Sequence, residues 1–548
     1  MKKKMTRKTV LSIVTYVVLM TLLVACGSSG NSGGTPSTTP GTTEQAGETN
    51  KPGNGGEAAG NEPITLKMLA SRTPVHADYK DMMVWKDYEQ MSGVTVEWDL
   101  VPDANFVEKR NILLAGGDYP DAIYRALLSN SDVMARGGEG VFIKLNDLIE
   151  QHAPNLMKLF EKYPEVRSGI TQADGNIYSL PFVSDFESAN YGGKMFINKK
   201  WLDQIGMAEP ETTDDFYKML KAFKEKDGNG NAQADEIPLT STDIESIINA
   251  LKGFWGLGNR GGAHPLVDMN EETNELRFIP GDDRYKEVLE FLNKLYKEDL
   301  IDKEIFTMNS SKLTAKGEDD LVGSFIFPNP VPIGQKTKDN YIGMHALKGP
   351  YGDQIITSVN PVLRNAGAFV ITNKNQHPER TMQWVDYWYS EEGMELFFMG
   401  KEGETFTKTA DGQYQYVEDI TNNPNGLTLD EAVGQHMPWP GSGQPTVQTE
   451  KFSKGGASYP SAMEATAKVS EHFPKEVWTP FTHTQAESDF LASVGNDITT
   501  YVNEMKVKFI SGSVPFSEWE KYMDTLNKMG LNDYMDVYKE AYNRYTES

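Results

Sequence analysis

The chain has 548 residues and a formal net charge of −25 at pH 7. This acidity argues against a nucleic-acid partner and against electrostatic attachment to anionic lipid, because both partners are themselves negative. A single cysteine, Cys26, excludes an internal disulfide framework. The length is sufficient for two or more hydrophobic cores.

The N-terminal segment has the pattern of a bacterial signal peptide. Five basic residues between positions 2 and 8 precede an apolar stretch from Val10 to Val24, too short for a membrane-spanning helix. The stretch ends in Leu22-Leu23-Val24-Ala25-Cys26, which resembles the lipobox of bacterial lipoproteins. That resemblance implies a signal peptide over residues 1–25, an acylated (palmitate-bearing) Cys26 and an extracytoplasmic protein anchored to the cell membrane by lipid. The alternative is an ordinary N-terminal anchor with an incidental cysteine.

A polar linker separates Cys26 from the folded part. Residues 27–62 are mostly Gly, Ser, Thr, Pro, Asn and Glu. Such a composition buries too little apolar surface to offset the entropy of ordering the chain. With the lipidated cysteine, residues 26–62 are therefore predicted to form a flexible tether, and folding is predicted to begin near Pro63.

The first folded segment alternates strands and helices. Strands are predicted at 64–70, 94–98 and 122–124, with helices at 81–92 and 106–115 between them. This order implies a parallel α/β sheet. Ligands of open sheets bind at the carboxyl ends of the strands. Arg72 and Arg125 follow two of these strands and are candidate ligand contacts, although a structural role is equally open.

The rest of the chain continues the mixed pattern. Strands are predicted within 174–181 and at 194–198 and 367–372, and helices at 145–161, 213–224 and 378–398. The last hundred residues are predicted to be largely helical, with a long amphipathic stretch over 488–509.

One acidic loop has the spacing of a calcium site. Calcium requires several hard oxygen ligands from a flexible segment. The loop places oxygen-bearing side chains close together at Asp227, Asn229, Asn231, Asp235 and Glu236. Its start matches positions one, three and five of an EF-hand loop, but Ala232 replaces the usual glycine and Pro238 the bidentate glutamate. From spacing alone, a calcium loop and a solvated turn both remain open.

Tryptophans divide into predicted core residues and candidate sugar contacts. Aromatic faces commonly cover the apolar face of a sugar ring. Trp255 and Trp439 lie in Gly- and Pro-rich loops, which tend to present side chains, and both are candidate ligand contacts. Five others fit helical patterns and are predicted to be core: Trp85, Trp201, Trp384, Trp388 and Trp519.

Seven stretches, in order, resemble the family 1 extracellular solute-binding lipoproteins of bacterial ABC importers. More narrowly, they resemble the large branch that includes alginate-oligosaccharide-binding proteins. The stretches are residues 113–123, 174–181, 195–202, 212–223, 227–238, 508–512 and 519–522. Each is weak alone, but the ordered set spans nearly the whole predicted mature chain.

The resemblance implies a two-lobed α/β fold of the type II periplasmic-binding-protein class, with a hinge and a ligand cleft between the lobes. Lobe one would hold residues 63–185, lobe two residues 186–365, and residues 366–440 would return to lobe one. Residues 441–548, mostly helical, are assigned to neither lobe. Asp185 and Tyr191 fall near the first crossing between lobes and join the candidate ligand contacts.

The resemblance also implies one structural Ca²⁺. In related proteins, acids at loop positions nine and ten and a backbone carbonyl at position seven are ligands, which carries over to Asp235, Glu236 and Gln233. These would act with Asp227, Asn229 and Asn231.

The implied function is a monomeric, lipid-anchored receptor that binds an oligosaccharide without catalysis and delivers it to importer permease subunits. No Gly-x-Ser-x-Gly, phosphate-loop or His-Glu-x-x-His motif occurs. The alternatives are a secreted polysaccharide-acting enzyme and a binding protein for peptides or other solutes.

Overall fold

The computed structural model describes residues 62–547, so the predicted signal peptide, Cys26 and nearly all of the predicted tether lie outside it. Within that range, none of the helices combines the length and the apolar character needed to cross a membrane.

The first lobe, as we use the term, is built on a six-stranded sheet with the order β14-β4-β11-β3-β1-β2. β1 (Ile64–Arg72) pairs in parallel with β2 (Val94–Pro102) and β3 (Ala122–Leu128). β11 (Leu363–Ile371) runs antiparallel between β3 and β4 (Leu180–Asp185), and β14 (Val447–Thr449) is parallel to β4. The carboxyl ends of all strands except β11 therefore meet at one edge.

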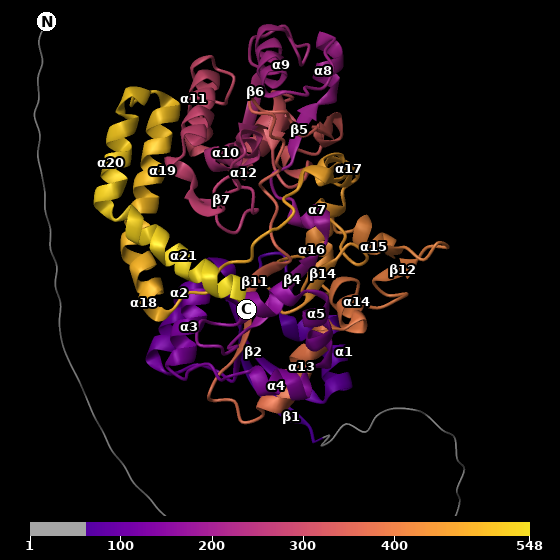
Figure 1. Cartoon of the computed structure of the whole chain (residues 1–548). Helices are drawn as coiled ribbons and strands as arrows, with labels where there is room; N and C mark the ends of the chain where they lie inside the picture. The colour runs from indigo at the N-terminus through magenta and orange to yellow at the C-terminus, as the bar shows by residue number, and fades with distance from the viewer. Residues whose placement is uncertain (1–61, 548) are drawn as a thin grey trace, which may run out of the picture. The chain divides into compact units, whose positions relative to one another are not determined.

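Helices and a small hairpin complete the first lobe (Figure 1). Trp85, Trp384 and Trp388 are buried in its core, where the Trp85 ring lies 5.3 Å from that of Trp388. The elements are α1 (Met83–Ser92), α2 (Asp103–Gly116), α3 (Asn130–Gly138), α4 (Asn146–His152), α5 (Pro154–Lys162), α6 (Pro164–Ile170), α13 (Pro378–Asp386), α14 (Glu391–Phe398), β12 (Phe406–Lys408), β13 (Tyr414–Tyr416), α15 (Glu418–Thr421) and α16 (Leu429–Val433).

The second lobe is built on a four-stranded sheet with the order β10-β5-β9-β6. β6 (Ile237–Ser241) and β9 (Val322–Ile326) are parallel, whereas β5 (Met195–Asn198) runs antiparallel to β9 and to β10 (Tyr341–Gly343). The surrounding elements are α8 (Lys199–Ile205), α9 (Thr213–Glu225), α10 (Ile244–Leu251), β7 (Val267–Asn270), β8 (Glu275–Phe278), α11 (Asp283–Lys297), α12 (Ser310–Glu318) and α17 (Pro460–Val469). The short α7 (Glu187–Asn190) lies in the first crossing between the sheets.

The C-terminal helices pack on the second lobe, an assignment that the sequence left open, and α18 also contacts α3 of the first lobe. They are α18 (Gln485–Phe490), α19 (Asn496–Ser511), α20 (Trp519–Met529) and α21 (Leu531–Glu547). Buried side chains from Ile498 to Tyr534 belong to the second-lobe core. Asn293 of α11 donates hydrogen bonds to the carbonyls of Phe509 and Ile510, both at 2.9 Å, which ties α19 alongside α11 (Figure 1).

The predicted α/β class with two separate sheets is confirmed, and all five tryptophans predicted as core are at most 7 % exposed. The return to the first sheet continues to Thr449, beyond the boundary at residue 440 that the sequence suggested. A three-residue strand within a Pro-, Gly- and Ser-rich segment carries too little hydrophobic pattern to be recognised from sequence.

Candidate functional site

The carboxyl edge of the first sheet is shaped by an irregular end of β3. Arg125 and Leu127 adopt positive φ angles of 50° and 51°, which non-glycine residues rarely adopt. The Nη1 of the buried Arg110 donates to the carbonyls of Ala126 and Leu127 at 2.6 and 2.7 Å. A charged donor thus stabilises the strained turn at which β3 leaves the sheet.

A loop from Met437 to Gln444, called here the Trp439 loop, lies against this edge. Three side chains each donate a hydrogen bond to a backbone carbonyl of the loop, at every second residue. Gln444 Nε2 donates to Pro438 O at 3.1 Å, His76 Nε2 to Pro440 O at 2.6 Å, and Arg125 Nε to Ser442 O at 2.7 Å. The two prolines lack N–H groups, so the loop depends on side chains to fix its backbone.

Arg125 is itself fixed by neighbouring polar groups. Its Nη1 forms an ion pair with Asp103, the first residue of α2, and donates to Ser71 Oγ at 3.1 Å. The Ser71 hydroxyl also donates to Asp103. Arg125 is 6 % exposed, so its donors are directed at the protein rather than at solvent.

His76 is held as a neutral ring. Burial lowers its pKa from 6.5 to about 4. Since a carbonyl oxygen can only accept, the proton lies on Nε2, and Nδ1 is the unprotonated nitrogen.

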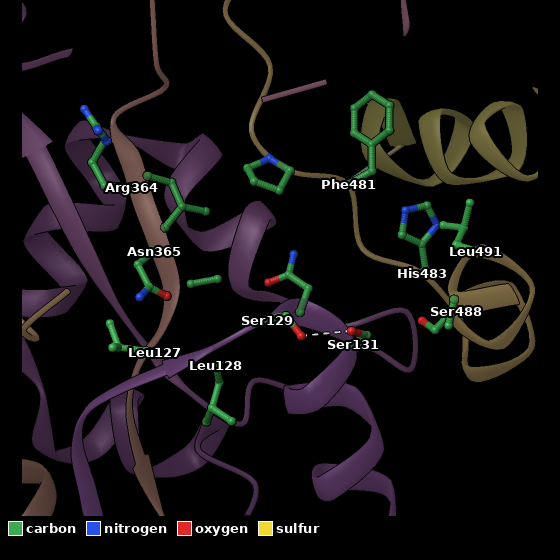
Figure 2. A pocket seen from close by; sticks show the side chains of 15 residues that line it. Leu127, Leu128, Ser129, Ser131, Arg364, Asn365, Phe481, His483, Ser488 and Leu491 are labelled. Atoms are coloured by element: carbon green, nitrogen blue, oxygen red, sulfur yellow. Dashed lines mark hydrogen bonds between the residues drawn. The ribbon is translucent and has the colours of Figure 1, made fainter. Parts of the chain in front are cut away.

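A cavity of about 660 Å³ opens near this edge of the first sheet (Figure 2). Its walls come from the end of β3 and start of α3, from the start of β11, and from the segment 480–492, whose Leu491 packs on the second-lobe core. Polar groups converge on it, including Ser129 and Ser131, whose hydroxyls lie 2.9 Å apart. The buried Nδ2 of Asn130 has no hydrogen-bond partner within the described residues.

The cavity adjoins the Trp439 loop directly. An added Cβ at Gly443 would lie 2.8 Å from Leu127 and 3.5 Å from the amide nitrogen of Asn365, and both side chains line the cavity. Gly443 has a φ of 87°, so two constraints favour glycine there.

A second, smaller pocket of about 280 Å³ lies at the carboxyl ends of β6 and β9 in the second lobe. Thr357, Ser358 and Asn360 of the crossing into β11 line it, and residues 363–366 of the same segment line the larger cavity. The buried Oδ1 of Asn249 also lacks a partner among the described residues. The two pockets thus flank one crossing segment, and the lining of each contains one amide atom that lacks a partner among the described residues.

Lys194 and Arg364 fix the backbone of the first crossing. The buried ammonium of Lys194 donates to the carbonyls of Ser188 and Tyr191 at 2.7 and 2.6 Å, and burial lowers its pKa to about 7. Arg364 donates to Ala189 O at 3.1 Å and to Asn190 Oδ1 at 3.0 Å.

Of the six predicted ligand residues, none lines either pocket. Trp439 is partly exposed and packs against Phe398, with ring centroids 5.0 Å apart. Arg72 ends β1 and is partly exposed. Asp185 ends β4 and forms an ion pair with Lys162 at 2.6 Å.

Tyr191 and Trp255 are buried, at 3 % and 4 % exposure, in the second-lobe core. The expectation that a glycine-rich loop presents the Trp255 side chain is wrong. Residues Lys252–Trp255 form a short 3₁₀ helix, and the indole packs against Phe291, with ring centroids 5.4 Å apart. The flanking glycines allow close backbone approach instead, because a Cβ at Gly253 would lie 2.0 Å from the carbonyl of Ile355.

The polar residues that line the pockets were missed from sequence. Asn130 begins α3 and Asn249 lies within α10, and no local motif marks either residue. Ser129 and Ser131 follow β3, but the strand predicted at 122–124 ends five residues before Ser129, so the sequence did not mark them.

The acidic loop is folded around Asp227. The carboxylate of Asp227 accepts from the backbone N–H groups of Gly230, Asn231 and Ala232 at 2.7, 3.0 and 2.9 Å. Asp235 accepts from the side-chain amides of Asn229 and Asn231 at 3.1 Å. Ala232 has the positive φ of 60° that position six of such a loop requires. Glu236 is 6 % exposed and accepts from Gly228 N at 3.2 Å.

The loop fits a cation through mixed oxygen donors rather than through an acid cluster. Within residues 62–547, no group of three or more His, Cys, Asp or Glu side chains is placed to hold a metal. Ligation would therefore use amide and backbone oxygens beside the carboxylates, a donor set that calcium accepts. An amide flip exchanges the oxygen and nitrogen of Asn229 or Asn231 without moving the chain.

Residues 73–395 match the family model described as bacterial extracellular solute-binding protein. The chain belongs to this family. The resemblance seen in the sequence is thereby confirmed, as is the expectation of a binding protein rather than an enzyme.

Similarity to individual members of the family extends over nearly the whole chain. The fructooligosaccharide ABC transporter substrate-binding protein FusA of Streptococcus pneumoniae is 29 % identical over 88 % of this chain and 91 % of its own length. Its structure in complex with kestose has a TM-score of 0.71 at 27 % identity, and the match covers 88 % of this chain and 99 % of that one. The structure of its EF-hand mutant in complex with fructo-nystose gives the same values. Alginate-binding protein AlgQ2 without calcium ion shares the fold, with a TM-score of 0.69 at 22 % identity and the same coverages.

Proposed function

We propose that this solute-binding protein is an oligosaccharide receptor of an ABC importer. The observation that carries the proposal is the similarity to FusA over about nine-tenths of both chains, and the polar linings of the two pockets are consistent with a sugar ligand. Fructooligosaccharides such as kestose are the first ligand class to test, because FusA is named for them and was solved with kestose.

The geometry of the site supports a sugar ligand. Two pockets with hydroxyl and amide groups flank one crossing segment, and the partly exposed Trp439 adjoins the larger one through its loop. Free amide groups at Asn130 and Asn249 suit sugar hydroxyls, and an aromatic face suits the apolar side of the ring. We propose Asn130, Asn249 and Trp439 as contacts, and keep Arg72 and Asp185 as peripheral candidates.

The pocket chemistry favours binding over hydrolysis. Most glycosidases use a pair of carboxyl groups on either side of the scissile bond. Neither lining, as described, contains an Asp or a Glu, although the chain has 78 acidic residues. A bound oligosaccharide would thus meet hydrogen-bonding partners and no acid pair.

We propose further that the 227–236 loop binds one structural Ca²⁺ through Asp227, Asn229, Asn231, Asp235, Glu236 and the carbonyl of Gln233. Support comes from the positive φ at Ala232 and the inward-facing amides. The EF-hand mutant of FusA and the calcium-free form of AlgQ2 indicate that such sites occur among relatives.

The proposed location is the outer face of the cell membrane, with a lipid on Cys26 as the anchor and the receptor acting as a monomer beside its permease. The lipobox and the polar tether support this, and both lie outside the described residues.

A binding screen tests the proposed function. Thermal-shift measurements with fructooligosaccharides, pectic and milk oligosaccharides and a peptide library should give stabilisation by oligosaccharides only. Stabilisation by peptides alone would replace the proposed ligand class.

A further inference from the structure

The Trp439 loop has no regular secondary structure, yet three side chains hold it: His76 and Arg125 from other parts of the first lobe, and Gln444 of the loop itself. They bond successive alternate carbonyls, of Pro438, Pro440 and Ser442. Apart from Met437, whose N–H donates to Val433 O at 3.1 Å, no backbone N–H of the loop donates to a backbone carbonyl within the described residues. The conformation of the loop therefore rests on these three bonds and on close packing.

The packing around the loop leaves little room for another conformation. Gly441 has a φ of 143°, and a Cβ there would lie 3.1 Å from Gln444 Nε2 and 3.6 Å from Thr73 Cγ2. A Cβ at Gly443 would lie 2.8 Å from Leu127 and 3.5 Å from the amide nitrogen of Asn365, both at the wall of the larger cavity. The indole of Trp439 extends from the same segment and packs on Phe398.

We propose that Arg125, His76 and Gln444 are positioning residues for ligand binding, which act by fixing the Trp439 loop and hence its indole. This proposal rests on the proposed function, since Trp439 must contact the ligand. Arg125 is then not a ligand contact. Its Nε is used by Ser442 and its Nη1 by Asp103 and Ser71.

A fixed loop changes the free energy of ligand binding without adding a contact to the ligand. A loop that must be ordered on binding reduces affinity by the free energy of ordering it, whereas a loop already fixed does not. Removing one buried donor leaves its carbonyl unsatisfied and frees the loop. We expect each such substitution to weaken binding roughly tenfold. The loss should arise only from the Trp439 contact, because these residues act by fixing its loop.

Three variants remove the bonds one at a time. Gln444→Met and His76→Phe replace a donor by an apolar side chain of similar reach. Arg125→Lys keeps a cation for Asp103 and removes the Nε–H that serves Ser442. Tyr88→Phe is the matched control, because the Tyr88 hydroxyl donates a buried hydrogen bond to Trp384 O at 2.7 Å in the same lobe, away from the loop.

Hydrogen exchange on the free protein tests the first half of the proposal. Peptides covering residues 437–446 should exchange faster than in wild type in each of the three variants. In Tyr88→Phe their exchange rate should equal that of wild type. Unchanged exchange in all three would overturn the proposal, whatever the ligand proves to be.

Calorimetry with kestose tests the second half through double-mutant cycles. Each variant should weaken binding in the wild-type background and have no further effect when combined with Trp439→Ala. An equal loss in both backgrounds would mean a direct contact and would overturn the positioning role. If kestose does not bind the wild-type protein, the proposed ligand class fails, and the exchange result still decides whether these residues order the loop.

Discussion

Arg125 Nε donates a 2.7 Å hydrogen bond to the carbonyl of Ser442, although the two residues are 317 positions apart in the sequence. The bond joins the irregular end of β3 to the loop that carries Trp439. Because the same guanidinium also pairs with Asp103 at the start of α2, three segments of the first lobe meet at one side chain. These contacts fix the end of β3, the Trp439 loop and the start of α2 to one another at the carboxyl edge of the first sheet.

Replacing Trp439 by Ala should affect ligand binding, whereas replacing Trp255 by Ala should affect stability. Trp439→Ala should weaken oligosaccharide binding by about 2 kcal/mol or more and change thermal stability little, since the indole is partly exposed. Trp255→Ala should lower the free energy of unfolding by about 3–5 kcal/mol, because the indole is 4 % exposed in the core. Calorimetric titration and thermal unfolding of both variants provide the comparison. Unchanged affinity in a folded Trp439→Ala variant would remove this residue from the site.

Calcium should stabilise the protein. Chelation should lower the unfolding temperature and added Ca²⁺ should restore it, by about 2.7 kcal/mol when calcium is at 100 times its dissociation constant. Asp235→Asn removes a carboxylate that only side-chain amides contact, and should abolish the calcium effect. Asp227→Asn should destabilise the protein with and without calcium, since Asp227 also holds three backbone N–H groups. An identical response to chelator in wild type and Asp235→Asn would contradict the assignment.

Stability should fall as the pH drops from about 6.5 to about 4. Burial lowers the pKa of both His76 and His264 to about 4, so in this range the unfolded chain binds protons that the folded chain does not. The free energy of unfolding therefore decreases as the pH falls through this window and levels off below it. His264→Phe should reduce the slope by up to about 1.4 kcal/mol per pH unit, measured against wild type by denaturant unfolding. A variant slope equal to that of wild type would mean that His264 is protonated in the folded protein.

Cys26→Ser should prevent lipid attachment. Expressed in a bacterial host, the variant should be released or retain its signal peptide, because a thiol is the acylation site in the lipobox pattern. Mass spectrometry of the mature N-terminus provides the direct readout. Cleavage at another position in the wild-type protein would argue against the proposed anchor.

Periodic features were predictable from the sequence. The strands predicted at 64–70 and 94–98 lie within β1 and β2, and tryptophans predicted as core from helical spacing, such as Trp384 and Trp388, are buried. The acidic loop was also visible, because its oxygen donors are local in sequence. These features depend on residues within one element.

Features that depend on distant contacts were not predictable. Arg125 follows the strand predicted at 122–124, which suggested a ligand contact, but it lies within β3, and its hydrogen-bond partner Ser442 is in a loop more than 300 residues away. The glycines around Trp255 suggested an exposed loop, whereas they permit the approach of the segment near Ile355. The pocket residues Asn130 and Asn249 come from different lobes, and only the fold brings their pockets to the same crossing segment.

The central claim, that the protein binds an oligosaccharide without altering it, is tested most directly by calorimetric titration with kestose and a panel of longer fructooligosaccharides, followed by chromatographic analysis of the recovered sugar. We predict saturable binding to one site for at least one member of the panel, with every sugar recovered intact. Shortened or rearranged sugar after incubation, or binding to peptides with none to any oligosaccharide, would contradict the account.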